Sequence, residues 1–194
     1  EEKYRNNVYC SIGLNNDRHL NSLNKYLNFK SLEIPQKLLL FNCNPITNSD
    51  RTIILGHAKT IWKDFCNIIY DTGYLRSYVG TSFTDYKITI NVTKPTTYKM
   101  MSEYKFAICP QGNGIETHRM WECLYLNIIP VVIYNPLLSE LYDNLPICVC
   151  KQWTDITKEY LEHYYDKYNK QIYNMKLLDL DYWINKIKSY GIDV

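Results

Sequence analysis

The sequence lacks any hydrophobic run long enough to cross a bilayer. Its longest apolar stretches, such as residues 38–41 and 128–134, fall far short of the about 20 apolar residues that a spanning helix needs. It also lacks an excess of either charge, because 22 Lys and Arg residues oppose 20 Asp and Glu residues. Nucleic-acid-binding domains usually carry a basic stripe, so the net charge of +2 gives no indication of a nucleic-acid partner.

No C-x-x-C pair occurs among the seven cysteines, which argues against a zinc ribbon and a dithiol redox motif. Cys148 and Cys150 would share one face of a strand, but too far apart for a relaxed disulfide. We expect most of the cysteines to be small buried side chains in a reducing compartment. The expected location is the cytoplasm, with a Golgi-like lumen as the alternative if an upstream anchor was removed.

What is present, from residue 37 onward, is an alternation of short apolar runs and helical patterns. This order predicts an α/β fold, with a Rossmann-like parallel sheet and helices on both faces. Strands are expected at residues 37–43, 86–92, 104–109, 128–134 and 145–150. Helices are expected after residue 49 or 50 and at residues 95–103, 117–126, 137–142, 157–170 and 181–190, with a loop at 73–84. Residues 1–36 are expected to be a linker, and residues 37–194 the domain.

Two helices show their buried side most clearly in the sequence. In the helix that follows residue 49 or 50, Ser49 or Asp50 is the expected N-cap. Its expected inner stripe is Ile53, Ile54, Ala58, Ile61, Trp62 and Phe65. The helix at 157–170 carries a stripe of Tyr160, Leu161, Tyr164, Tyr165 and Tyr168, which we interpret as packing rather than as a sugar platform.

A tight glycine turn, Gly112-Asn113-Gly114, follows the expected strand 104–109 and precedes the helix 117–126. Ligands of open parallel sheets bind at the carboxyl ends of the strands. Glycines allow the backbone to approach a ligand closely, and the N–H groups of a helix start attract phosphates. The turn is neither a Walker loop nor a full G-x-G-x-x-G. Two interpretations stay open: a phosphate cradle, or a simple tight turn.

The helix after this turn begins with an ionic cluster. Glu116, Arg119 and Glu122 are spaced i, i+3 and i+6, and His118 is four residues before Glu122. A cation is disfavoured at a helix N-terminus, so Arg119 would be better accommodated beside a bound anion. The alternative is a salt-bridge ladder on a solvated face. His118 and Glu122 lack an obvious third ligand, so we expect no metal site.

Arg51 lies after the first expected strand, near the start of the next helix. Two arginines, Arg51 and Arg119, could therefore grip a pyrophosphate from neighbouring strand–helix loops. The alternative for Arg51 is a surface side chain in a polar loop.

The stretch YKFAICPQGNGIETHRMWECLYLNIIPVVI, followed by LPICVCKQWTDIT, resembles the C-terminal motif region of exostosin-like glycosyltransferases. LLLFNCNPITNSDR is similar to the first strand and following loop of the same domain, and the matches cover residues 37–157. The resemblance implies one half of a GT-B fold, which consists of two Rossmann-like domains. It also implies an inverting enzyme that holds a nucleotide-sugar donor, a UDP-sugar, and needs no metal or other cofactor.

The resemblance also implies roles for individual residues. Arg119 would neutralise the donor diphosphate, with Arg51 as a second contact, and Glu122 would hold the ribose hydroxyls. The backbone of Gly112, Asn113 and Gly114 would approach the phosphates. His118 fits the motif without a clear role.

The general base is not identified, and His118 and Glu116 are the candidates for a catalytic group. Glu116 stands where the family more often has aspartate. Asn127 stands where it has glycine, and Asn is the next-best residue for a left-handed helix end.

The expected function is transfer of a sugar to a glycan or other hydroxyl acceptor. Residues 1–36 resemble an interdomain segment that leads from a missing or reduced N-terminal domain. The acceptor-binding half would then be absent, and this chain could be inactive by itself. A viral or microbial cell is the expected setting. The alternative is a non-catalytic module that binds a nucleotide or nucleotide sugar and acts with a partner.

Overall fold

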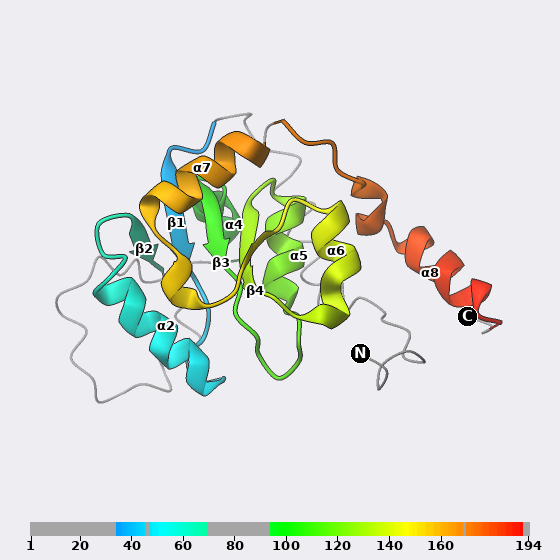
Figure 1. Cartoon of the computed structure of the whole chain (residues 1–194), viewed down its shortest axis with the longest axis horizontal. Coiled ribbons are helices and arrows are strands. Elements are labelled where there is room, and N and C mark those ends of the chain that lie inside the picture. The colour runs from blue at the N-terminus through cyan, green and yellow to red at the C-terminus, as the bar shows by residue number, and fades with distance from the viewer. Residues whose placement is uncertain (1–33, 46, 70–93, 169, 192–194) are drawn as a thin grey trace.

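A computed structural model describes residues 34–45, 47–69, 94–168 and 170–191 (Figure 1). Its centre is a sheet of five parallel strands in the order β2-β1-β3-β4-β5. The strands are β1 Lys37–Phe41, β2 Cys66–Ile68, β3 Tyr104–Ile108, β4 Ile129–Ile133 and β5 Cys148–Cys150. The sequence therefore predicts the fold class correctly: this is an α/β protein with a Rossmann-like sheet.

The strands are short apolar runs because side chains on both faces of the sheet are buried. Leu39 and Phe41 of β1 point to one face and Leu40 points to the other, and all three are fully buried. Phe106 and Ala107 of β3 divide between the two faces in the same way. A helical layer must therefore cover each face.

Helices do cover both faces (Figure 1). The core on one face contains side chains of α2 Ser49–Lys59 and α7 Lys158–Tyr168. The core on the other face contains side chains of α4 Lys94–Met101, α5 His118–Tyr125, α6 Ser139–Asn144 and α8 Leu180–Ser189. Short 3-10 turns occupy η2 Pro136–Leu138, η3 Trp153–Asp155 and η4 Met175–Leu178.

The start and inner stripe of α2 differ from the prediction. The N-cap is Asn48, whose side chain accepts a hydrogen bond from the backbone N–H of Asp50, and not Ser49 or Asp50. The helix ends at Lys59, so the predicted stripe overruns it. Ile54, Ala58 and Trp62 of the predicted stripe are buried, whereas Ile53 and Ile61 are 58% and 60% exposed. Leu55, which the prediction did not include, is also buried on α2.

Helix α5 agrees with the helix expected at residues 117–126, and Met120, Cys123 and Leu124 are buried on it. Asn127 follows it with a φ of 58°, so this asparagine does adopt the left-handed conformation expected of it. Strand β2 was not predicted. The expected strand at 86–92, the loop at 73–84 and the linker up to residue 33 lie outside the described residues.

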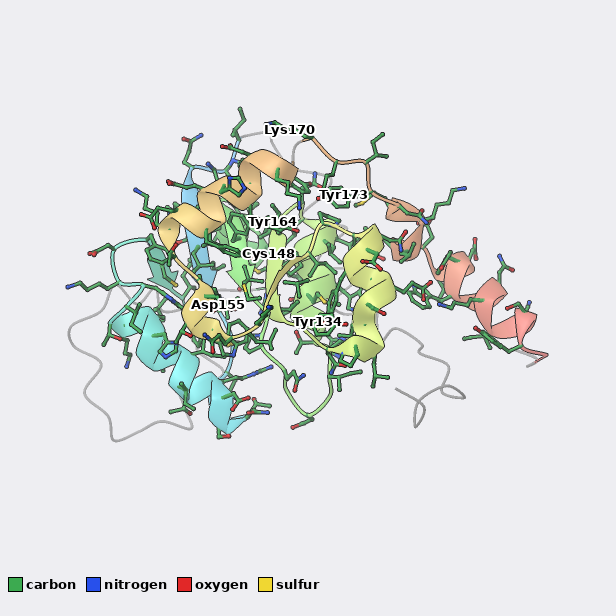
Figure 2. All side chains as sticks on the ribbon, in the orientation of Figure 1. Tyr134, Cys148, Asp155, Tyr164, Lys170 and Tyr173 are labelled. Carbon is green, nitrogen blue, oxygen red and sulfur yellow. The ribbon has the colours of Figure 1, made fainter. Side chains whose placement is uncertain are left out.

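The tyrosines of α7 pack against the sheet, as expected. Tyr164 of α7 and Cys148 of β5 meet where α7 packs on the sheet (Figure 2), and the Tyr164 hydroxyl donates to the carbonyl of Ile147 at 2.6 Å. Tyr160 donates to the carbonyl of Val149 in the same way. The cysteines within the described ranges are all free and buried. None of the helices described here is both long and apolar enough to span a membrane.

The C-terminal helix α8 extends away from the sheet (Figure 1). Its Trp183 enters the core and donates to the carbonyl of Leu177 at 2.9 Å. Tyr182 and Lys186 both donate to the carboxylate of Glu140 on α6. These contacts hold α8 beside α6.

Candidate functional site

The candidate site lies where the connections of the sheet change direction. The chain runs outward from β1 to β2 and then returns to β3 on the other side of β1. In open parallel sheets, the crevice outside the carboxyl ends of two such strands is the usual ligand site. In this protein the loop after β1 (residues 42–45 and 47–48) and the loop after β3 (residues 109–117) lie at that end of the two strands. The glycine turn, for which a phosphate cradle and a simple tight turn were both considered, belongs to the second loop.

Arg51 joins these two loops. Its guanidinium donates from Nε to the carbonyl of Gln111 (2.8 Å), from Nη2 to that of Pro110 (3.1 Å) and from Nη1 to that of Asn44 (3.3 Å). Only 8% of the residue is exposed, so it is not a surface arginine. Arg51 and Arg119 both lie at the edge of the sheet where the strands end, as the sequence indicates. Arg51, however, directs three of its N–H groups to the backbone.

These contacts orient the backbone of the loop after β3. The carbonyls of Pro110 and Gln111 face Arg51, and the carbonyl of Gly112 accepts from the side chain of Asn48 at 3.3 Å. The peptide units are trans, so the N–H of each unit points opposite to its C=O. The N–H groups of Gln111, Gly112 and Asn113 therefore point away from α2. Among the described residues, none accepts a hydrogen bond from them.

Gly112 leaves little space for a side chain in this packing. A Cβ placed there would lie 3.0 Å from Nη2 of Arg51 and 3.8 Å from Cγ2 of Thr117. Thr117 is the N-cap residue of α5, although its side chain makes no capping hydrogen bond. Its Oγ1 is buried and has no partner within the part of the chain that the structure describes. The three N–H groups and this hydroxyl thus gather close to the start of α5.

Arg119 lies in the first turn of α5, and its side chain is 16% exposed. Burial raises the pKa of the Cys43 thiol to about 12, and the positive charges of Arg51 and Arg119 partly oppose that rise. Burial also raises the pKa of the Cys109 thiol, and the positive charge of Arg119 partly opposes that rise as well. Since such charge effects weaken with distance, Arg119 lies near the carboxyl ends of both β1 and β3.

Glu122 is more deeply buried than the sequence indicates. It is 2% exposed, one carboxylate oxygen pairs with Nη1 of Arg119 at 2.8 Å, and the other accepts from the hydroxyl of Tyr98 at 2.9 Å. The Arg119–Glu122 pair of the salt-bridge alternative therefore forms, but it lies on a buried flank and not on a solvated face, because Tyr98 of α4 covers it. Both oxygens of the residue expected to hold a ribose already have protein partners.

Glu116 and His118, the candidate catalytic groups, have different surroundings. Glu116 is 7% exposed and accepts a hydrogen bond from Nε1 of Trp121 at 3.2 Å, so it ties the loop to α5. His118 is the first residue of α5 and is partly exposed. The described residues contain no group of three or more His, Cys, Asp or Glu side chains placed to hold a metal.

A cleft of about 320 Å³ opens on the other side of the start of α5, over the ends of β4 and β5. Its wall combines carboxylates, amides, an amine and aromatic rings, in particular Asp50, Gln111, Glu116, Tyr142, Lys151, Gln152 and Trp153. The sequence does not predict this cleft, because its residues come from separate loops.

No protein-family model matches the chain, and no significant match to a curated protein was found. The solved structures that are similar in shape include the following two. UDP-GlcNAc 2-epimerase of Methanocaldococcus jannaschii, in complex with UDP-GlcNAc and UDP, has a TM-score of 0.45 and 13% identity over 91% of this chain. The α,α-trehalose 6-phosphate synthase of Burkholderia multivorans has a TM-score of 0.44 and 9% identity over 92%. In both cases the chain spans 49% of the other protein's length.

Proposed function

We propose that this domain binds the nucleotide-sugar donor of an inverting glycosyltransferase. The observation that carries the proposal is the orientation of the loop after β3. Three consecutive carbonyls face Arg51 and Asn48, so three consecutive N–H groups face the opposite side. Successive N–H groups beside a helix N-terminus form a concave anion site, which suits a diphosphate. Arg119 adds a positive charge at the same edge of the sheet.

The proposed reaction is a direct displacement at the anomeric carbon of the donor sugar. The acceptor hydroxyl oxygen forms a bond to that carbon while the bond to the diphosphate oxygen breaks, and the acceptor's proton passes to a base. Negative charge grows on the departing diphosphate, so fixed N–H donors and a guanidinium stabilise the transition state more than the bound donor. The proposed donor is a UDP-sugar and the acceptor a glycan or another hydroxyl compound. These cationic and N–H groups make a metal unnecessary in the proposal.

The second candidate is a module that binds a nucleotide sugar without transferring it. The observation in its favour is the state of Glu116, which is buried and holds the indole of Trp121 instead of facing an acceptor. A transfer assay with a panel of UDP-sugars and oligosaccharides separates the two candidates. Binding without release of UDP would favour the module.

Calorimetric titration of the chain with UDP, GDP and uridine tests the donor site itself. We expect both diphosphates to bind better than uridine, because the phosphates make the principal contacts. Loss of a hydrogen bond to a charged group costs about 1.5–3 kcal/mol, so Arg119→Ala should weaken UDP by about 10- to 150-fold. Lys158→Ala is the matched control, since Lys158 is an exposed cation in the first turn of α7. A wild-type chain that binds neither diphosphate would refute the proposal.

A further inference from the structure

A buried tyrosine stands behind the ionic pair at the start of α5. Tyr98 of α4 is fully buried, and its hydroxyl donates to Oε1 of Glu122 at 2.9 Å. Burial raises the pKa of this hydroxyl, and the neighbouring carboxylate of Glu122 raises it further. Tyr98 is therefore protonated at any physiological pH and remains a donor. With no exposed surface, it cannot touch a ligand at the site.

The other oxygen of Glu122 continues the chain of contacts. Oε2 pairs with Nη1 of Arg119 at 2.8 Å, and Nη1 also lies against Sδ of Met101 at the end of α4. The guanidinium is thus fixed from the α4 side by a carboxylate that is itself fixed by Tyr98. An arginine side chain has many rotamers, and one that is already ordered loses less conformational entropy when it binds an anion.

We infer that Tyr98 and Glu122 are positioning residues that hold the guanidinium of Arg119 in place for a diphosphate. This inference rests on the proposed function, which gives Arg119 its anion. It departs from the role that the resemblance implies for Glu122, namely contact with the ribose hydroxyls. A carboxylate that is 2% exposed and bonded through both oxygens would have to give up a partner before it could reach a ribose.

The two roles of Glu122 predict different ligand dependence. A positioning residue affects every ligand that carries the diphosphate, whether or not a ribose is attached. A ribose contact affects only ligands with the 2′- and 3′-hydroxyls. The probes are therefore inorganic pyrophosphate, UDP and 2′,3′-dideoxyuridine diphosphate, titrated against wild type, Tyr98→Phe and Glu122→Gln.

We expect Tyr98→Phe and Glu122→Gln each to weaken all three probes by a similar factor of about five to ten, since each removes one hydrogen bond of the chain. In an Arg119→Ala background, Tyr98→Phe should cause no further loss, because the guanidinium it serves is gone. Tyr104→Phe is the matched control, as Tyr104 is 2% exposed on β3. This substitution also removes a buried tyrosine hydroxyl, and it should leave the affinities for all three probes unchanged.

Arg119 can also be observed directly without any ligand. In NMR spectra of arginine-labelled protein, the Nε–Hε group of Arg119 should be ordered in the wild type and mobile in Tyr98→Phe and Glu122→Gln. The inference is overturned if the group stays equally ordered in both variants. It is also overturned if Glu122→Gln weakens UDP alone and spares pyrophosphate and the dideoxy compound. A wild type that binds no diphosphate, yet shows the expected ordering, refutes the proposed function and leaves Arg119 as an ordered structural side chain.

Discussion

Replacement of Arg51 by methionine probes the contact between the loops after β1 and β3. Methionine keeps the apolar stem and removes the guanidinium, which donates to three carbonyls at 2.8, 3.1 and 3.3 Å. Hydrogen bonds from charged groups contribute about 1.5–3 kcal/mol each. The 3.3 Å bond to Asn44 is the weakest of the three. After the substitution, water can also hydrogen-bond to the carbonyl of the exposed Gln111, which reduces the loss. We therefore expect the free energy of unfolding to fall by about 3–5 kcal/mol, near the contribution of the two shorter bonds.

Urea unfolding, followed by tryptophan fluorescence and circular dichroism, measures this loss. Lys63→Met is the control, because Lys63 is an exposed cation just after α2 and its removal should change the stability by less than about 0.5 kcal/mol. A loss below about 1 kcal/mol in Arg51→Met would refute the reasoning.

Arg51→Lys separates the structural role of Arg51 from direct contact with a ligand. Lysine keeps the charge but cannot reproduce the planar fork of donors, so it cannot bond three carbonyls at once. If Arg51 orients the loop, Arg51→Lys should weaken UDP nearly as much as Arg51→Met does. If Arg51 binds the diphosphate directly, the retained charge should preserve most of the affinity.

The other predictions concern the glycines and α8. Gly112→Ala should destabilise the protein by about 1–2 kcal/mol, because the new Cβ lies 3.0 Å from a buried guanidinium. Gly114→Ala should leave the stability unchanged, because a Cβ at that position would meet nothing closer than 3.7 Å. Thermal unfolding of both variants measures this difference. Burial raises the pKa of Glu140, but hydrogen bonds from Lys186 and Tyr182 outweigh it and leave that pKa below 4.5. The lowered pKa means that Glu140 stabilises the fold above about pH 4.5, and that this stabilisation is lost as the pH falls through the folded-state pKa. The protection of the α8 amides against hydrogen exchange, corrected for the intrinsic exchange rate at each pH, should therefore decrease in acid by less than about 1 kcal/mol, because the pair is partly exposed. Glu140→Gln should abolish this pH dependence. Equal acid sensitivity in that variant would contradict this assignment.

The strands of the central sheet could be predicted because each of them is buried on both faces. A parallel sheet covered by two helical layers admits only apolar side chains, so β1, β3 and β4 stand out as short continuous runs. β2 spans only Cys66–Ile68, which is too short for any periodicity to develop. The N-cap of α2 was misplaced by one or two residues because Asn48, Ser49 and Asp50 are all good caps, and only the backbone conformation decides among them.

The predicted site residues lie together at one edge of the sheet, but their contacts depend on residues far apart in the sequence. Arg51 bonds to carbonyls about 60 positions away, and no local pattern indicates which arginine will do so. The spacing of Arg119 and Glu122 predicts that they can pair, and they do. This spacing cannot indicate that Tyr98 of α4 covers the side of α5 that carries Arg119 and Glu122. Because of Tyr98, the ion pair is buried and not exposed on the surface.

The most direct test of the central claim is a titration of the isotopically labelled chain followed by amide NMR. We predict that UDP and pyrophosphate shift the N–H resonances of Gln111, Gly112 and Asn113 strongly downfield, as expected for amides that begin to donate to phosphate oxygens. Uridine should leave these three resonances unchanged. If UDP binds while all three stay in place, the diphosphate lies elsewhere and the proposed donor site is contradicted.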